Sequence, residues 1–259
     1  MEQQTSFLDQ TSIAFKSYGK AIQLLFTRGL WVYMIYPIII YILLLAAEFY
    51  FAGRLYDAFK SMIFQWIDPE NFHSSWMSFI FVTMHYFLWI GLHIIFFLII
   101  YLFGKYIVLI LMSPIMAVLS AKTESILTGK KYPFSLSQLF RDVFRGVAIA
   151  FRNMFFQLLI LLASCFLIWI PVIGWLCPIF LLIISYYFYG SSMLDYVSER
   201  RKLSVADSIL FVRENKGLAI GNGFIFTLLF ALPFIGVVLS TVLSPIAACV
   251  SVLEKEGKI

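Results

Sequence analysis

The sequence predicts an all-α integral membrane protein with two long transmembrane helices, two helical hairpins tipped by Pro and Gly, and an N-terminal amphipathic helix. Apolar residues form 62% of the 259 residues and charged residues 13%, whereas soluble proteins average about 45–50% and about 25%. The mean hydropathy is +0.92, and 28 Phe, 14 Tyr and 6 Trp provide side chains suited to lipid and to the membrane interface. A soluble enzyme, a disordered chain and a disulfide-linked scaffold do not fit this composition.

Residues 1–30 are predicted to form an amphipathic helix on the membrane surface. They lack the uninterrupted apolar core and the small-residue cleavage site of a signal peptide. Apolar residues recur at helical spacing between polar ones, and the apolar set is Ala14, Tyr18, Ala21, Ile22 and Leu25. Gly29 is expected to end this helix before the first span. Alternatively, the segment extends the first span as one continuous helix.

Residues 31–112 are expected to contain the two long spans. Trp31–Ala47 has no charged residue, and the apolar stretch continues to Ala52. About 20 residues cover a hydrocarbon core of about 30 Å, so this stretch is long enough to cross. After a polar loop, a second apolar stretch runs from Trp76 to Met112. It is longer than a bilayer is thick, so it should tilt or project into the cytoplasm.

Residues 113–153 are expected to form a cytoplasmic helical segment. A new helix is predicted to begin at Ser113, since Ser is a good N-cap and the Pro that follows suits the first helical position. This helix would carry Lys122 and Glu124 and end near Gly129. The rest of the segment is amphipathic and basic.

Two hairpins are predicted in the last part of the chain, at residues 154–189 and 221–253, separated by a cytoplasmic segment at 190–220. Each hairpin has an apolar run, a break containing Pro and Gly, and a second apolar run; the breaks read IPVIG and LPFIG. Like the two breaks, SPIMAVLS, from residue 113, and SPIAACVS, from residue 244, are similar segments, and the two pairs together indicate an internal duplication. The predicted hairpin tips are Pro171, Gly174, Pro233 and Gly236.

The apolar arms of these hairpins are short, at roughly 9 to 18 residues or about 14 to 27 Å of helix. Pro and Gly at the tip prevent one continuous helix from forming. We therefore expect each hairpin to dip into the membrane and return. The alternative is four thin, tilted full spans, which would give six spans in all.

The distribution of charge predicts the topology. Residues 48–76 hold four acidic and two basic residues, whereas residues 104–153 hold two acidic and seven basic ones. Basic residues concentrate on the cytoplasmic side, so Asn71 in the acidic loop should face outside. The positions expected in the cytoplasm, with both termini, are Lys131, Arg201 and Lys258. The two-span and six-span models share this prediction, because an even number of full spans places both termini on the same side of the membrane in either model.

The sequence offers no catalytic, metal-binding or cofactor-binding motif. No nucleophile-elbow, Walker or dinucleotide-binding pattern occurs, and His73, His85 and His93 lack the spacing of metal ligands. We expect His85 and His93 to make interhelical hydrogen bonds or to face water. Cytoplasmic loops explain the net charge of +5, and no basic cluster interleaved with aromatic residues indicates nucleic acid. The cysteines expected to pack as small apolar side chains are Cys165, Cys177 and Cys249.

Polar residues beside the apolar helices are candidates for a transport path, because ionisable groups in a membrane are costly and mark paths by default. The alternative is that they snorkel to water, and this is what we expect for Lys105 and Asp195. The hairpin tips are a second feature that could form part of a transport path. A half-helix that begins inside the membrane points unpaired N–H groups and a positive dipole end at an anion. Alternatively, the hairpins only pack against the spans.

Several short features occur in order along residues 10–252. They are the amphipathic start, Gly29-Leu30, Pro37, Ser113-Pro114, Glu124, Leu127-Thr128-Gly129, the IPVIG break, Asp195-Tyr196 and the LPFIG break. Their order and spacing resemble the CysZ sulfate-permease family and the related etoposide-induced-protein domain. This resemblance implies an inner-membrane protein with two long spans and two partly penetrating hairpins, which assembles into oligomers and lets sulfate enter the cell.

The chain departs from the pattern of that family at two places. The family's sulfate-binding arginine pair follows the glycine near the first span, where this chain has Trp31 and Val32. Arg28 precedes Gly29 and is the candidate substitute. The family's Asn in the Ser-Pro region is Met116 here.

We therefore expect a CysZ-like channel or transporter of the inner membrane that passes a small, sulfate-like oxyanion down its gradient. Its expected partners are the lipid bilayer, the anion and further copies of the same chain in a homo-oligomer. The alternative is a non-transporting membrane scaffold of the same fold. The candidate path residues are Arg28, Lys122, Glu124, Arg152, Asn153, Lys216 and Asn222.

Overall fold

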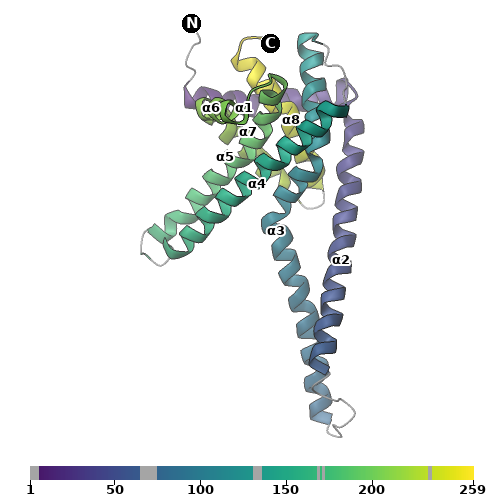
Figure 1. Ribbon diagram of the computed structural model, residues 1–259. Helices are drawn as coiled ribbons and strands as arrows, with labels where there is room; N and C mark the ends of the chain where they lie inside the picture. The colour runs from purple at the N-terminus through teal and green to yellow at the C-terminus, as the bar shows by residue number, and fades with distance from the viewer. Residues whose placement is uncertain (1–5, 65–74, 131–135, 168–169, 171–172, 233–234) are drawn as a thin grey trace. The chain divides into compact units, whose positions relative to one another are not determined.

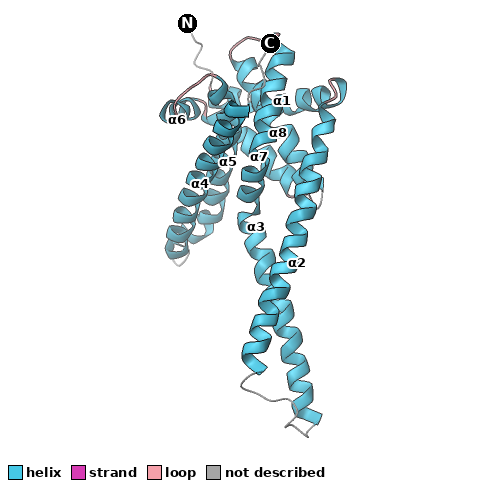
Figure 2. Ribbon diagram, turned by 45° about the vertical axis from the view of Figure 1, so that its right-hand side comes forward, coloured by secondary structure: helices cyan, strands magenta, loops and turns pink. Residues whose placement is uncertain are grey.

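The computed structural model describes residues 6–64, 75–130, 136–167, 170, 173–232 and 235–259, and all regular elements in these ranges are helices (Figures 1 and 2). The predicted all-α fold class is confirmed. The chain divides into two compact units: unit 1 comprises Met1–Ile38 and Tyr106–Ile259, and unit 2 comprises Ile39–Lys105. The assignment of the whole chain to a single domain stays a prediction.

Five helices of the described part are long and apolar enough to cross a membrane. They are Leu30–Phe59, Ile110–Thr128, Phe144–Ser164, Gly174–Arg200 and Ile235–Lys255. The first of them covers the predicted first span. Large apolar side chains remain exposed along it, as they would on a surface that lipid covers.

The N-terminal helix α1 spans Phe7–Thr27, and it ends where the sequence predicts. The backbone N–H of Arg28 closes the last turn on the Leu24 oxygen, and Gly29 follows in the left-handed conformation with φ of 67°. Glycine adopts that conformation at no steric cost. A short 3-10 helix, η1 (Leu30–Met34), then leads into α2 (Ile35–Phe64). The alternative of one continuous helix is therefore wrong.

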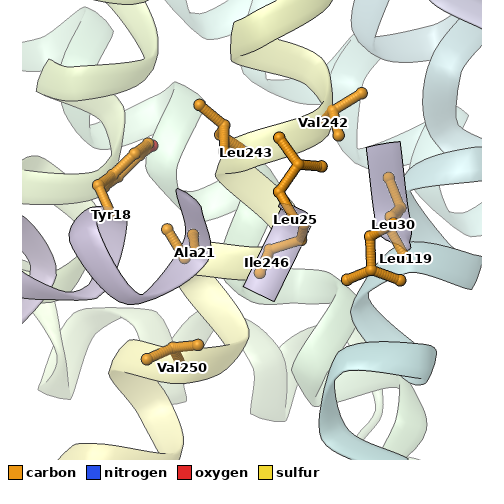
Figure 3. Close-up of a cluster of buried hydrophobic side chains, with 10 residues drawn as sticks. Tyr18, Ala21, Leu25, Leu30, Leu119, Val242, Leu243, Ile246 and Val250 are labelled. Atoms are coloured by element: carbon orange, nitrogen blue, oxygen red, sulfur yellow. The ribbon is translucent and has the colours of Figure 1, made fainter. Parts of the chain in front are cut away.

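The predicted apolar face of α1 packs against protein rather than against lipid. Ala14, Tyr18, Ala21 and Leu25 are buried, and α1 lies across α7 (Lys216–Phe230) and α8 (Ile235–Lys255) in Figure 1. Figure 3 shows Tyr18, Ala21 and Leu25 in one cluster with side chains of α8. The prediction that this face rests on the membrane is wrong for these four residues.

The exposed side of α1 carries a second apolar stripe that includes one residue of the predicted face. Ile22 is 47% exposed, together with Leu8, Phe15 and Phe26. These positions follow one another at intervals of seven or four residues, so they lie on one side of the helix. This stripe, rather than the predicted one, is the part of α1 suited to a membrane surface.

Helix α3 (Ser75–Thr128) runs through the Ser-Pro pair without interruption, so the prediction of a new helix at Ser113 is wrong. Pro114 lies inside the helix and offers no N–H to the carbonyl four residues before it, which is that of Ile110. The Ser113 hydroxyl donates to this carbonyl instead, at 2.8 Å. The predicted end is confirmed, because the helix stops at Thr128 and Gly129 follows with φ of 73°.

Four helices form two pairs in unit 1. Helices α4 (Leu136–Leu167) and α5 (Ile173–Arg200) lie side by side in both views (Figures 1 and 2), and α7 packs against α8. The short helix α6 (Val205–Glu214) connects the pairs. Helices α4, α5, α7 and α8 have 32, 28, 15 and 21 residues, and α4 and α5 continue beyond the apolar runs of the predicted hairpin into the polar segments beside it. How deeply the pairs enter a membrane stays a prediction.

Helix α8 is the centre of unit 1. Nearly all of its residues from Gly236 to Leu253 are buried, and α1, α5 and α7 contact it. Gln10 of α1 fixes the start of α7, since its side-chain oxygen accepts the backbone N–H of Gly217 at 3.1 Å and its amide nitrogen donates to Glu214 O at 3.3 Å. An N–H of the first helical turn, which has no partner within the helix, is satisfied in this way.

Unit 2 consists of the adjoining parts of α2 and α3, held together by aromatic and histidine side chains. The Tyr56 hydroxyl shares a hydrogen bond with the imidazole of His85. The ring of Phe49 lies 6.0 Å from that of His93, which also makes a hydrogen bond with Trp89 O within its own helix. The predicted interhelical hydrogen bond is thus confirmed for His85.

Candidate functional site

Glu124 and Arg200 form a buried ion pair that links α3 to α5. The Arg200 Nη2 to Glu124 Oε2 distance is 2.8 Å, and the side chains are only 6% and 7% exposed for Arg200 and Glu124. Arg200 also donates to Ser120 Oγ at 2.6 Å and to Cys249 Sγ of α8 at 3.4 Å. Arg200 thus connects α5 to α3 and α8. Because its guanidinium already binds the Glu124 carboxylate, this carboxylate is not open to another cation.

A second ion pair joins α4 to α5 through Arg145 and Asp195. Arg145 donates Nη2 to Asp195 Oδ1 at 2.9 Å and Nε to Oδ2 at 3.1 Å, a two-pronged geometry that suits a planar guanidinium. The Ser208 hydroxyl of α6 donates to the same Oδ1. Asp195 is 3% exposed, so the prediction that it snorkels to water is wrong. The side chain of Lys105 lies outside the described residues.

Arg152 and Asn153, two of the candidate path residues, lie together on α4. Asn153 is fully buried, and its amide nitrogen donates to Phe188 O at 3.2 Å and to Ser192 Oγ at 3.0 Å, both on α5. Its oxygen accepts from Nε and Nη2 of Arg152, at 3.3 and 2.9 Å. Asn153 therefore connects the Arg152 guanidinium to the α4–α5 pair.

A pocket opens beside Arg152 between α4, α5 and α6, and we call it the Arg152 pocket. Its wall combines a guanidinium that forms no ion pair with any described residue, an ion-paired carboxylate and two hydroxyls with apolar side chains. The lining residues are Ile149, Arg152, Ser191, Asp195, Val205, Ser208, Ile209 and Val212. Arg152 thus lies at a partly enclosed site rather than on an open surface.

Asn222, a further candidate, lies in a hydrogen-bond network between α1, α7 and α8. Its amide nitrogen donates to Leu218 O at 2.9 Å and to Ser251 Oγ at 3.2 Å, and its backbone oxygen accepts from the Tyr18 hydroxyl at 3.0 Å. Tyr18 also makes a hydrogen bond with Ser244 Oγ at 2.9 Å. The Asn222 Oδ1 atom has no partner among the described residues. In this orientation Asn222 offers an acceptor, which an anion does not need.

The remaining three candidates lie apart from this pocket. Arg28 and Lys216 are exposed at the end of α1 and the start of α7. Lys122 is exposed on α3, with its Nζ 5.3 Å from the centre of the Tyr33 ring. The structure therefore brings Arg152 and Asn153 together and leaves the other candidates dispersed.

The hairpin tips are described in part. Gly174 is partly buried in the first turn of α5, where its N–H donates to Ile170 O at 2.9 Å. Gly236 is buried, and a Cβ added there would meet Leu229 O at 2.4 Å, so a side chain would force α7 and α8 apart. The two predicted tip prolines, Pro171 and Pro233, lie outside the described residues.

Two arginines of the site were missed by sequence reasoning. Arg145 and Arg200 are each 50 or more residues from the acid that they bind, with separations of 50 and 76 residues. Each stands in a polar stretch that reads as a cytoplasmic surface. The only signal in the sequence is indirect. A buried acid within an apolar stretch needs a cation as its partner, so Asp195 and Glu124 each predict a basic residue nearby in the fold, without indicating which one.

Near the end of the chain, Glu256 binds two cations outside the candidate spans. Arg201 Nη2 donates to Glu256 Oε2 at 2.8 Å, and Lys258 Nζ donates to the same atom at 2.7 Å. Burial alone would raise the pKa of the Glu256 carboxyl, but the hydrogen bonds from Arg201 and Lys258 outweigh burial and lower this pKa below its usual range. This cluster ties the α5–α6 connection to the end of α8.

The comparisons with known proteins point to one family. The model of the family described as Sulfate transporter CysZ/Etoposide-induced protein 2.4 matches residues 17–240. The matched segment covers most of the chain and includes every candidate residue named above. A search of the curated proteins gives no match.

Proposed function

Because the chain belongs to the Sulfate transporter CysZ/Etoposide-induced protein 2.4 family, we propose that it passes a small oxyanion, sulfate first, across the membrane down its gradient. The chain is a multi-pass membrane protein of a transporter family. The single observation that carries the proposal is the family match along residues 17–240.

The charges of unit 1 support an anion as the cargo. The acids Glu124, Asp195 and Glu256 are each bound by an arginine, whereas Arg152 contacts a neutral amide. A cation path would need carboxylates that remain open, and an anion path needs cations that do. Arg152 and Arg28 are the first two of the cations that we assign to the path.

Among the candidate residues, we assign two kinds of role. Arg28, Lys122, Arg152 and Lys216 supply positive charge along or near the path. Glu124, Asn153 and Asn222 position helices, since their hydrogen bonds are made to other residues of the fold. Arg28, beside Gly29, replaces the arginine pair whose places hold Trp31 and Val32.

We further propose that the protein works as a homo-oligomer in the inner membrane with both termini in the cytoplasm. The acidic loop and the basic segments support this orientation. A cysteine at Asn71 should react with an impermeant maleimide added outside, and one at the exposed Lys258 should not. Labelling of Lys258→Cys from outside would overturn the orientation.

A second candidate function is a non-transporting scaffold. It is favoured by the two buried ion pairs, Glu124–Arg200 and Arg145–Asp195, which brace helices of unit 1 instead of lining an open route. A measurement of sulfate flux into liposomes distinguishes the transporter from the scaffold. Purified protein in liposomes should admit radiolabelled sulfate without ATP, and the scaffold function takes its place if sulfate, thiosulfate and chloride all enter no faster than into empty liposomes.

A further inference from the structure

We infer that the exposed apolar stripe of α1, together with the cations beside its second half, is a docking surface for the anionic lipid headgroups of one membrane leaflet. The stripe consists of Leu8, Phe15, Ile22 and Phe26, and the cations are Lys16, Arg28 and Lys122. The inference goes beyond the proposed transport and does not require it, because lipid contact at α1 is measured without flux.

The first support is that α1 lies where two candidate spans begin or end. The helix ends at Thr27, and the first candidate span begins at Leu30. Lys20 of α1 binds Glu254 at 3.0 Å in the last turn of α8, where another candidate span ends. Figure 1 shows α1 lying across α7 and α8. These contacts place α1 at the level of the headgroups, where amphipathic helices lie.

The second support is that the stripe continues onto the exposed apolar surface of neighbouring helices. The ring of Phe15 lies 5.8 Å from that of Phe224 on α7, and the ring of Phe224 lies 5.3 Å from that of Tyr186 on α5, a candidate span. Phe224 is 38% exposed, and Leu228, one turn further along α7, is 59% exposed. The stripe is therefore the edge of a larger apolar surface of the kind that lipid covers.

The third support is the positive charge beside the second half of the stripe. Lys16, Arg28 and Lys122 are exposed, and none of them forms an ion pair with any residue that the structure describes. The Lys122 Nζ atom lies 5.3 Å from the centre of the Tyr33 ring of η1, which places this cation beside the end of α1. Two of the three, Arg28 and Lys122, are also cations that we propose near the path.

The acidic residues of the adjoining helices do not cancel this charge. Helix α1 carries no acid after Asp9. Glu254 of α8 is bound by Lys20, and Glu124 of α3 is bound by Arg200. The positive charge beside the stripe therefore remains available, and clusters of Lys and Arg at a membrane surface attract anionic lipids.

The same charges argue against a second copy of the chain as the occupant of the stripe. In a two-fold symmetric interface, the same surface of each copy meets the other, so the cations of one copy would lie near those of its partner without a counter-ion. An anionic leaflet supplies the counter-ions. The long stem of Lys16 can lie along the apolar surface while its amine reaches a headgroup phosphate.

The test places an NBD fluorophore on Ile22→Cys, in a background without the native cysteines, and measures its quenching by spin-labelled lipids in nanodiscs. Phosphatidylglycerol and phosphatidylcholine, each spin-labelled in the acyl chain, are compared at the same mole fraction. We expect both lipids to quench the fluorophore, and phosphatidylglycerol to do so more strongly, because the cations concentrate it around α1. The matched control is Gln23→Cys, the exposed polar neighbour about 100° round the helix, which either lipid should quench little.

The contribution of charge is tested by adding Lys16→Gln to the labelled protein. This change should reduce the preference for phosphatidylglycerol by up to about fivefold, the effect of one basic residue at an anionic surface. Salt at about 1 M should abolish the preference by screening. Arg141→Gln removes the same charge from an exposed position of α4, and it should leave the preference measured at Ile22→Cys unchanged.

Equal quenching of Ile22→Cys by the two lipids would overturn the inference, as would a preference for phosphatidylglycerol that both Lys16→Gln and salt leave unchanged. Absence of quenching by either lipid would overturn it as well. In that case, a disulfide that joins two protomers through Ile22→Cys would identify a second copy of the chain as the occupant of the stripe.

Discussion

Gly190 of α5 and Gly223 of α7 lie face to face at the closest approach of these two helices. A Cβ added at Gly223 would lie 1.8 Å from Tyr186 O and 2.9 Å from the Gly190 backbone nitrogen, and one added at Gly190 would lie 1.8 Å from Ala219 O. Small residues let helix backbones approach in this way inside membranes. The two glycines therefore let the backbone of α5, which carries Asp195 and Arg200, pack directly against that of α7.

Alanine at either glycine should separate the two helices. We expect Gly190→Ala and Gly223→Ala each to lower the free energy of unfolding by about 1–3 kcal/mol or more, since the clash involves backbone atoms that cannot move aside locally. The control is Gly19→Ala in α1, where an added Cβ meets no atom within 4 Å. It should be neutral or stabilise the protein by about 0.5–1 kcal/mol. Melting temperatures in detergent would check this, and equal values for all three variants would contradict the close approach.

The buried Glu124–Arg200 pair predicts a pattern of stabilities. Glu124→Gln leaves the Arg200 charge buried without its counter-ion, at a cost of about 3–5 kcal/mol. Adding Arg200→Met to Glu124→Gln should recover much of this loss, because the uncompensated charge is gone. At the half-exposed pair Lys20–Glu254, Lys20→Ala should cost no more than about 1 kcal/mol. A double-mutant cycle measures the coupling, and additive losses would show that the two residues act independently.

The depth of the hairpin tips can be tested with cysteines at exposed neighbours, since a side chain at Gly236 would disturb α8. Trp175 is 88% exposed and Ile235 is 62% exposed. In a background without the native cysteines, Trp175→Cys and Ile235→Cys should resist an impermeant maleimide added outside, if the tips lie within the membrane. Rapid labelling of both from outside, at the rate seen for Asn71→Cys, would instead indicate full spans.

Acid should weaken the cluster at the end of the chain. The lowered pKa of Glu256 means that folding favours its ionised form, so its contribution to stability is present above the unfolded-state pKa, near 4.5. The contribution is lost as the pH falls below this value and through the folded-state pKa. Arg201→Gln should therefore destabilise the protein at neutral pH and do so less below about pH 4. A difference in melting temperature that stays constant between neutral and acidic pH would contradict this role of Glu256.

Local signals in the sequence predict local structure well in this chain. Gly29 ends α1 because only glycine adopts its positive φ at no cost, and Gly129 follows the end of α3 in the same way. The Ser113 prediction fails for a local reason too. The same hydroxyl that suits an N-cap can bond the carbonyl that proline leaves free, and sequence alone does not choose between these two uses.

The sequence alone does not show which residues far apart in the chain contact one another. The periodicity of α1 gives two apolar stripes, and only the packing of α7 and α8 decides that Tyr18 is buried while Ile22 is exposed. Likewise, Arg152 and Asn153 were found as polar residues beside an apolar helix. The neutralisation of Asp195 by Arg145, which leaves the Arg152 charge available, depends on the pairing of α4 with α5.

The central claim, passive passage of an oxyanion, is tested most directly by sulfate uptake into liposomes under a set membrane potential. Sulfate carries two charges, and each is worth about 2.3 kcal/mol per 100 mV, so about 60 mV, inside positive, should drive about hundredfold accumulation at equilibrium. We predict rapid, ATP-independent uptake that increases with inside-positive potential and is reduced by Arg152→Gln and by Arg28→Ala. Uptake no faster than into empty liposomes at every potential would contradict the account.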